Sequence, residues 1–364
     1  MTDQASATLS RDARAFIVLV SLLQALLLYL AWLGHDRLWW WLSPYASQVY
    51  WYTLILAVPT TMTLSVSRLD DRVFWQNALG VAVVHALLAG WAAWSVTGAP
   101  GIDIASVLAP FAITVGGALF VAWPFLQCRQ DGRWRAAYPE LFDHAWQNGL
   151  TLVVALLFTG VCWVVLTLWA QLFALVHIRF FKDLFFDDKP FVYLATGLFA
   201  GLGILIGRMQ QYPLRVARQI VFAVCRGLLP LLALIALMFL ASLPFTGLAP
   251  LWATRSAASL LLGLLLLLVV FVNAVWQDGV DLKPYPRALR WLIDAALILS
   301  PVYAALALYA LALRIGQYGW TDQRFWAVLV AVVLACHAIG YAVAALHRRG
   351  AWLGWLPRVN VGLA

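Results

Sequence analysis

Long runs of apolar residues alternate with short polar segments along almost the whole chain. Each run approaches the roughly 20 residues that an α-helix needs to cross the hydrocarbon core of a bilayer. Backbone amides in hydrocarbon must be bonded within the chain, so each run is expected to be helical. The second run is short and is interrupted by Pro59 and a cluster of threonines. The pattern predicts ten spans: 15–33, 49–66, 73–95, 105–126, 148–170, 190–207, 220–241, 256–276, 291–313 and 325–346.

Composition narrows the class of protein. Of the 364 residues, 64% are hydrophobic and 11% are charged, whereas soluble domains carry roughly one quarter charged residues. The predicted fold class is therefore all-α, a polytopic transmembrane helical bundle of about ten spans. The net charge of +8 does not indicate a nucleic-acid partner, because the lysines and arginines are scattered through short loops.

Positive charge is distributed unevenly between alternate loops. Segments on the N-terminal side of the membrane hold more than twice as many Lys and Arg residues as segments on the other side. Cytoplasmic loops carry such an excess, so both termini are predicted to be cytoplasmic. The turn between the last two spans then lies on the outer side, where arginines are not needed to fix the topology.

Two regions are predicted, residues 1–147 with four spans and residues 148–364 with six. After the fifth span, residues 171–189 place charged and apolar side chains on separate helical stripes. This pattern predicts an amphipathic helix at the outer interface, which either caps the bundle, roofs a cavity or contacts a partner. The sixth span is expected to be central, since small residues four apart allow close approach of a neighbouring helix. The glycines concerned are Gly197, Gly201, Gly203 and Gly207.

Ionisable side chains within spans mark places where function is expected, because burying them in lipid is costly. Four are found: His85, Arg226, Asp294 and His337. Two histidines and a carboxylate facing one cavity could form a proton path; alternatively, each histidine is bonded to a backbone carbonyl or a hydroxyl group. Asp294 is expected to pair with Arg290 one helical turn away. No hydrolase, nucleotide-binding or metal motif occurs at credible spacing, so no catalytic residue, metal or cofactor is predicted.

The polar turn over residues 313–324 contains the candidate ligand-binding residues Arg314, Tyr318, Trp320, Thr321 and Arg324. A structural interpretation explains most of them: the aromatic rings join an interfacial belt, and Thr321 caps the last span. This interpretation does not explain Arg314 and Arg324. Because guanidinium groups bind phosphate and carboxylate in a bidentate manner, the turn could alternatively hold an anionic ligand.

Four segments carry a resemblance to a known family: Arg314-x-x-x-Tyr-Gly-Trp-Thr-x-x-Arg324, Leu243–Trp252, Asn273–Gly279 and Trp355–Asn360. They resemble an uncharacterised family of bacterial inner-membrane proteins, defined by domain of unknown function 4153, over residues 140–364. The resemblance implies a bacterial cytoplasmic membrane and a helical fold, and no catalytic residues. Family members are often longer, so it implies either a short member or part of a longer chain.

Three functional hypotheses remain. The first is transport or handling of a polar, anionic or lipid-derived envelope ligand, and the prolines within spans, Pro59, Pro110, Pro230 and Pro301, favour it as sites of helix kinks. The second is a non-catalytic scaffold or subunit of an envelope membrane complex. The third, a membrane-embedded transferase, needs a buried acid or histidine facing its ligand. The expected partners are membrane lipids, an anionic lipid or envelope precursor, or another membrane protein.

Overall fold

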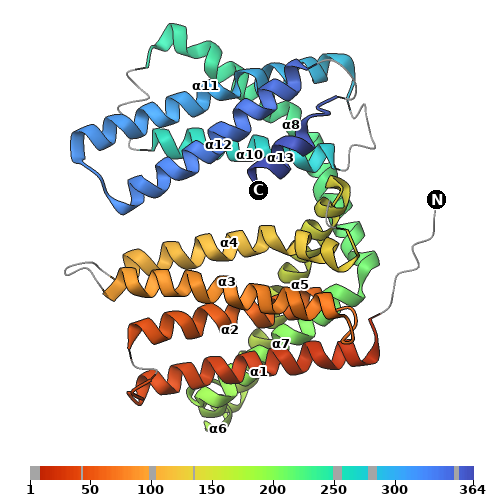
Figure 1. Cartoon of the computed structure of the whole chain (residues 1–364), viewed down its shortest axis with the longest axis vertical. Coiled ribbons are helices and arrows are strands. Elements are labelled where there is room, and N and C mark those ends of the chain that lie inside the picture. Colours follow the sequence, from red (N-terminus) through yellow and green to blue (C-terminus); the bar gives the residue numbers. More distant parts are fainter. Residues whose placement is uncertain are drawn as a thin grey trace. The chain divides into compact units, whose positions relative to one another are not determined.

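The computed structural model describes residues 9–41, 44–97, 104–133, 136–248, 256–277, 285–347 and 352–364. Within these residues the chain is helical and contains no strand (Figure 1). It divides into two compact units, Met1–Val216 and Ala217–Ala364, called unit 1 and unit 2 below.

Unit 1 consists of long helices with one short helical connection. Its helices are α1 (Arg11–Asp36), α2 (Tyr45–Ser65), α3 (Arg72–Thr97), α4 (Ile104–Gln130), α5 (Tyr138–Leu175), α6 (Phe180–Lys182), the π-helical turn η1 (Asp183–Asp187) and α7 (Lys189–Met209). The helix α8 (Gln211–Thr246) begins at the end of unit 1 and continues into unit 2. Unit 2 also contains α10 (Ala257–Trp276), α11 (Arg287–Tyr318), α12 (Asp322–Leu346) and α13 (Leu356–Leu363).

Each of the ten predicted spans falls in a different one of these helices and extends beyond it by at most one residue. Most of the helices are longer than the predicted spans, by up to ten residues at one end, as in α5. Among the described residues, nine helices are long and apolar enough to cross a membrane. The exception is α2, which has no charged residue but whose Tyr, Thr and Ser side chains lower its hydropathy. Outward faces carry exposed aliphatic side chains such as Leu79, Leu156 and Leu260, as contact with lipid tails requires. The protein is a multi-pass helical membrane protein; the position of its termini stays a prediction.

Helix α7 lies between α1 and α5, and its glycines make both contacts possible. A Cβ atom at Gly197 would collide with Ser21 and Ala25 of α1, and one at Gly203 would collide with Ala155 of α5. Gly201 and Gly207 repeat these two contacts one turn along. The predicted close approach at this span is therefore confirmed, with one glycine pair for each neighbouring helix.

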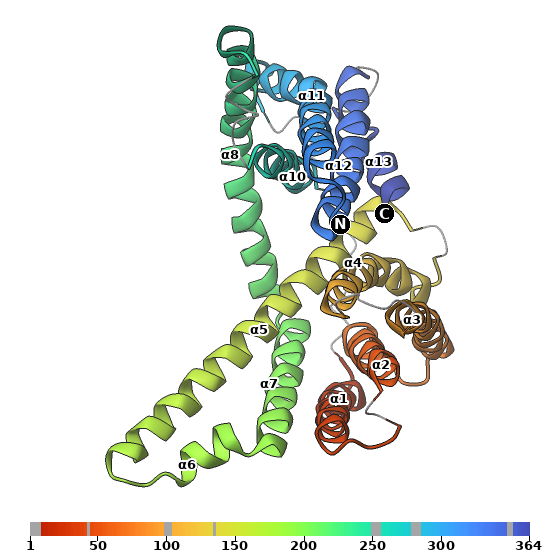
Figure 2. The same ribbon diagram turned by 90° about the vertical axis from the view of Figure 1, so that its left-hand side faces the viewer.

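The predicted amphipathic helix over 171–189 is wrong as a single element. Helix α5 continues to Leu175, and the chain then turns at His177, whose φ is 65°, before α6 and η1 (Figure 2). The reason is a cluster of aromatic rings. Phe181 lies 4.5 Å from Phe173 and 5.2 Å from Trp169, centroid to centroid, and this contact folds the segment back on the end of α5.

The division between units lies after Val216, and not after residue 147 as the sequence suggests. The contacts of α7 explain this, because its two glycine pairs tie α1 to α5 and so join the fifth and sixth spans to the first four. In unit 1 the buried apolar residues form two clusters, whereas in unit 2 one cluster links α8, α10, α11, α12 and α13.

Prolines inside helices leave a carbonyl group without its usual backbone donor, four residues earlier. In three helices a side chain donates to that carbonyl instead, as membrane-embedded helices require. The donors are Gln24 Nε2 to Ile55 O (2.9 Å) for Pro59, Tyr285 Oη to Arg226 O (2.7 Å) for Pro230, and Ser300 Oγ to Leu297 O (2.7 Å) for Pro301. The carbonyl groups freed at these three prolines are therefore hydrogen-bonded within the fold.

Candidate functional site

A polar cavity of about 440 Å³ lies in unit 1, where α1 begins, α2 and α4 end, α5 begins and α7 ends. Its lining includes a guanidinium (Arg208), an imidazole (His144), a carboxylate (Asp131) and two amides (Gln127 and Asn148). These groups come from α4, α5, α7 and the segment that follows α4. By the charge distribution this is the predicted cytoplasmic end of the unit.

Arg208 is the central charge of this cavity. Its half-buried side chain donates from Nη1 to the carbonyl of Thr63, at 2.8 Å. Within the described residues this is its one hydrogen bond, and no carboxylate pairs with it. A guanidinium carries five N–H donors, so most of its hydrogen-bonding capacity is available to a ligand.

The amides beside Arg208 are held in fixed positions. Gln127 Nε2 donates to Asn148 Oδ1 at 3.1 Å, and Asn148 Nδ2 donates back to Gln127 Oε1 at 2.9 Å. Gln127 also donates to Leu64 O at 3.2 Å, which fixes α4 against the end of α2. Thr151, one turn further along α5, has a buried Oγ1 with no hydrogen-bond partner in the part of the chain that the structure describes.

Two pairs of ionisable groups lie at or beside this cavity. His144 Nε2 lies 3.7 Å from Asp131 Oδ2. Arg68 binds Asp70 across an exposed loop, with 2.8 Å between Nη2 and Oδ2. The hydrogen bond from Arg68 lowers the pKa of Asp70 below its ordinary value, so this carboxylate is charged throughout the neutral range and occupies Arg68. Arg208 remains the cation without a carboxylate partner.

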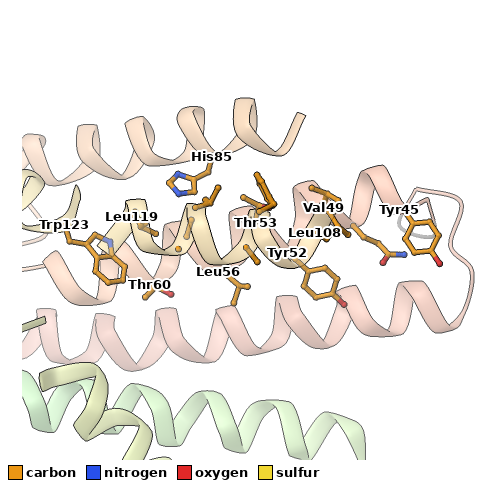
Figure 3. Close-up of a pocket in the computed structure, with 16 residues that line it drawn as sticks. Tyr45, Val49, Tyr52, Thr53, Leu56, Thr60, His85, Leu108, Leu119 and Trp123 are labelled. Atoms are coloured by element: carbon orange, nitrogen blue, oxygen red, sulfur yellow. The ribbon is translucent and has the colours of Figure 1, made fainter. Parts of the chain in front are cut away.

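A second cavity of unit 1, of about 480 Å³, lies between α2, α3 and α4 (Figure 3). Its lining is mainly aliphatic and aromatic, and Leu56 and Tyr52 of α2 face it with Leu119 and Trp123 of α4. His85, predicted from the sequence as an intramembrane polar residue, contributes from α3.

His85 is buried, and its two nitrogens differ. Nδ1 lies 2.8 Å from Val81 O, and because a carbonyl oxygen only accepts, Nδ1 carries the proton. Nε2 is buried and has no hydrogen-bond partner among the residues that the structure describes. In the neutral ring Nε2 is then an acceptor beside an apolar cavity. The bond from Nδ1 to a backbone carbonyl agrees with the structural interpretation of His85, whereas Nε2 can still accept a hydrogen bond.

The two cavities approach each other along α2 and α4. Thr60 and Trp123 line the apolar cavity, and Leu64 and Gln127, one helical turn further, line the polar one. Between them Trp123 Nε1 donates to Thr61 Oγ1 at 2.9 Å. A buried indole and hydroxyl therefore form the boundary.

The candidate turn of unit 2 has a largely structural arrangement. Helix α11 ends at Tyr318, and Gly319 has a φ of 74° that only glycine adopts easily. Thr321 caps α12 by accepting from the backbone N–H of Arg324, at 3.4 Å, as the sequence predicts. Arg324 Nη1 donates to Gly319 O at 2.6 Å, and its guanidinium lies over the Tyr318 ring. Arg324 thus closes the end of α11.

The other candidate residues of this turn differ in how exposed they are. Tyr318 and Trp320 are exposed, with 64% and 65% of their surface accessible, as expected of an interfacial belt. Arg314 is half-buried on α11. The two cavities of unit 1 are lined by other residues, so the turn and these cavities are separate features.

The remaining intramembrane candidates lie in unit 2. Asp294 accepts a hydrogen bond from Trp352 Nε1 at 2.7 Å, and the Arg290 guanidinium lies over the same indole. Trp352 therefore contacts both residues of the predicted pair, and the pairing of Asp294 with Arg290 stays a prediction. His337 Nδ1 lies 2.9 Å from Val333 O, the structural alternative for a lone histidine.

Arg226 lies on α8, where its guanidinium is 6.0 Å from the centre of the Tyr285 ring. Burial raises the pKa of Tyr285 to about 12, which keeps its hydroxyl protonated as the donor to Arg226 O. These contacts give Arg226 a structural environment.

A closed ring of hydrogen bonds in unit 2 was not predicted. Asn273 donates to Tyr341 Oη (2.6 Å), Tyr341 donates to Asn360 Oδ1 (2.7 Å), and Asn360 donates to Asn273 Oδ1 (2.6 Å). It joins α10, α12 and α13. The available signal was that Asn273 and Asn360 belong to two of the family-like segments, although the sequence did not show that they meet.

The sequence also matches a family model. The model described as Domain of unknown function (DUF4153) matches residues 57–364, which extends the resemblance well before residue 140 and includes Arg208, His85 and the ring of unit 2. No curated protein and no solved structure gives a significant match. Since the matched residues make up most of the chain, this multi-pass helical membrane protein belongs to the DUF4153 family.

Proposed function

We propose that this protein binds a molecule with an anionic phosphate or carboxylate group in the polar cavity of unit 1, and that it handles or transports an envelope lipid or precursor in the bacterial cytoplasmic membrane. The observation that carries the proposal is Arg208, a half-buried guanidinium that lines this cavity and has one protein acceptor among the described residues.

The physical argument rests on the cost of burying charge. A guanidinium removed from water needs a compensating charge, and leaving it uncompensated destabilises the protein. The described part of the chain supplies a carbonyl to Arg208 and leaves its charge unmatched. An anionic ligand would neutralise it and use the planar N–H groups in a bidentate contact. Asn148 would supply a further N–H beside it, since its bond to Gln127 uses one of its two amide N–H groups.

Arg314 and Arg324 were the sequence-based candidates for this role. Arg324 is engaged by the end of α11, which favours a structural role at the turn. That observation supports the second hypothesis, a scaffold or subunit that contacts another membrane protein. In that case the Arg208 cavity would contain water and no specific anion.

The test is native mass spectrometry of the protein released from nanodiscs of phosphatidylethanolamine, phosphatidylglycerol and phosphatidic acid. Arg208→Gln removes the charge and keeps a hydrogen-bond donor for Thr63 O. Arg215→Gln, at an exposed arginine of α8, is the matched control for lost charge. We expect an anionic adduct on the wild type and the control, and its loss from Arg208→Gln.

Two outcomes contradict the proposal. Equal adducts on Arg208→Gln and the wild type would show that anions bind elsewhere. No adduct on the wild type, when circular dichroism and a cooperative thermal transition show that it is folded, would favour the scaffold hypothesis. A crosslinking search for a membrane-protein partner would then follow.

A further inference from the structure

Resting on the proposed function, we infer that the ligand is an amphiphile, with its anionic head group at Arg208 and its hydrocarbon chain in the apolar cavity between α2, α3 and α4. This assigns a second binding site to unit 1, and it specifies the ligand as a single-chain or lipid-like phosphate or carboxylate. The alternative within the proposed function is a small polar anion, which would leave the apolar cavity out of the site.

The first argument is chemical. The polar cavity is lined by charged, amide and hydroxyl groups, whereas the other is lined mostly by aliphatic and aromatic side chains. Two adjacent cavities with these contrasting linings match the two halves of one amphiphilic molecule. A hydrated anion has no favourable contacts in the second cavity, because burial of an unpaired polar group is unfavourable there.

The second argument is the distance between the sites. On both α2 and α4 the lining passes from one cavity to the other within one turn, from Thr60 to Leu64 and from Trp123 to Gln127. One turn corresponds to a rise of about 5.4 Å. A chain attached directly to a head group at the polar end would therefore reach the apolar cavity within its first few carbons.

The boundary between the cavities consists of side chains. Trp123 donates to Thr61 Oγ1, and Thr61 itself donates to Ala57 O at 2.8 Å. Rotation of the indole breaks one hydrogen bond and leaves the hydroxyl bonded to its own helix. The backbones of α2 and α4 need not separate, so Trp123 can act as the partition that a bound chain displaces.

The size and shape of the apolar cavity suit a flexible chain. Its volume of about 480 Å³ lies within the range of ligand-binding pockets. Gly116 of α4 lines it, and a Cβ atom there would meet no atom within 4 Å. A side chain at residue 116 would thus occupy the space assigned to the ligand chain. Its neighbour Gly117 also has an open Cβ position but does not line the cavity.

These adjacent glycines define the experiment. Gly116→Leu fills the apolar cavity, and Gly117→Leu is the matched control with the same added volume in the same helix. The probes are dodecyl phosphate and ethyl phosphate, which share a head group and differ in chain length. Binding is measured by native mass spectrometry in phosphatidylcholine nanodiscs, with Arg208→Gln as the background for non-specific partition into lipid.

We expect the wild type to bind dodecyl phosphate at least tenfold more tightly than ethyl phosphate above that background. Gly116→Leu should lose this preference while retaining weak ethyl phosphate binding, and Gly117→Leu should retain both.

Contrary outcomes separate the two proposals. Equal affinity of the wild type for both probes contradicts the inference that the ligand is an amphiphile. It remains compatible with the proposed binding of an anion at Arg208. A chain-length preference unaffected in folded Gly116→Leu places the chain elsewhere and also contradicts that inference. If neither probe binds above the Arg208→Gln background, the proposed function itself fails. The comparison of probes on the wild type needs no variant, so it holds even if Gly116→Leu does not fold.

Discussion

Units 1 and 2 are built from similar apolar helices, yet they differ in how completely certain polar side chains are hydrogen-bonded. In unit 1, Arg208 has one protein acceptor, and Thr151 Oγ1 and His85 Nε2 have no hydrogen-bond partner among the described residues. In unit 2, Asn273, Tyr341 and Asn360 bond one another in a closed ring. The polar groups of this ring therefore stabilise unit 2, whereas Arg208, Thr151 and His85 of unit 1 line cavities.

Apolar packing follows the same division. Unit 2 has one continuous cluster of buried residues, whose large side chains include Tyr303, Leu265 and Leu297. Unit 1 has two separate clusters, and both described cavities lie in it. The exception in unit 2 is Arg290 Nε, which is buried without a partner beside Trp352. The contrast predicts that removing polar groups destabilises unit 2 and is tolerated or stabilising at the cavities of unit 1.

The largest effect is expected at the hydrogen-bonded ring. Asn273→Leu should lower the free energy of unfolding by about 2 kcal/mol, because Tyr341 and Asn360 lose partners in a buried site. Equilibrium unfolding in sodium dodecyl sulfate measures this. Leu267→Val, at an exposed position of the same helix, is the control and should change stability little. A loss no greater than that of the control would contradict the contrast between the units.

A smaller loss is expected where unit 1 does rely on a polar contact. Gln24→Leu should cost about 1 kcal/mol, since it leaves Ile55 O, freed by Pro59, without a donor. Pro59→Ala restores a backbone N–H for that carbonyl. The cost of Gln24→Leu should therefore fall in the Pro59→Ala background, and the same unfolding assay gives the coupling. Strictly additive effects would show that Gln24 does not compensate for the backbone hydrogen bond that Pro59 removes.

Much of the fold follows from local pattern. Hydrophobic run length gives the ten helices, the spacing of glycines gives the close contacts of α7, and Thr321 is identified as a cap by its place before the last span. The connection after α5 was mispredicted because charged stripes suggested a helix, whereas contacts among Phe173, Phe181 and Trp169 set its path. Ring contacts between separate turns have no simple periodic signal.

Less of the candidate site could be predicted from the sequence. Arg208 follows the sixth predicted span on the predicted cytoplasmic side, where arginines are expected to set the topology. Only its position beside Thr63 and the cavity indicates another role. Asn273 and Asn360 are 87 residues apart, so their contact depends on how α10 and α13 dock. Cavities arise from the relation between helices, which one sequence does not encode in any local motif.

A gain in stability is expected at the edge of the polar cavity. Thr151→Val replaces a buried hydroxyl that lacks a partner with a methyl group of similar size, and should raise the free energy of unfolding by about 1 kcal/mol. The matched control is Thr159→Val on the same helix, where Oγ1 donates to Ala155 O at 2.8 Å. The control should be neutral or slightly destabilised. Destabilisation of Thr151→Val beyond the control would mean that its hydroxyl is bonded, for example to water.

The smallest effect concerns the exposed pair of Arg68 and Asp70 at the cavity rim. Because the pKa of Asp70 is lower in the folded protein, the pair's stabilisation is present above the ordinary carboxyl pKa and is lost as pH falls through the lowered value. Stability near neutral pH should not vary through this group. Arg68→Gln should raise the pKa of Asp70 toward its ordinary value, measured by carboxyl carbon chemical shifts, with little change in Tm. An unchanged Asp70 pKa in Arg68→Gln would mean that Arg68 is not held by this carboxylate. Arg68 would then be a second cation for the ligand, and Arg208 would no longer be the distinguishing charge of the cavity.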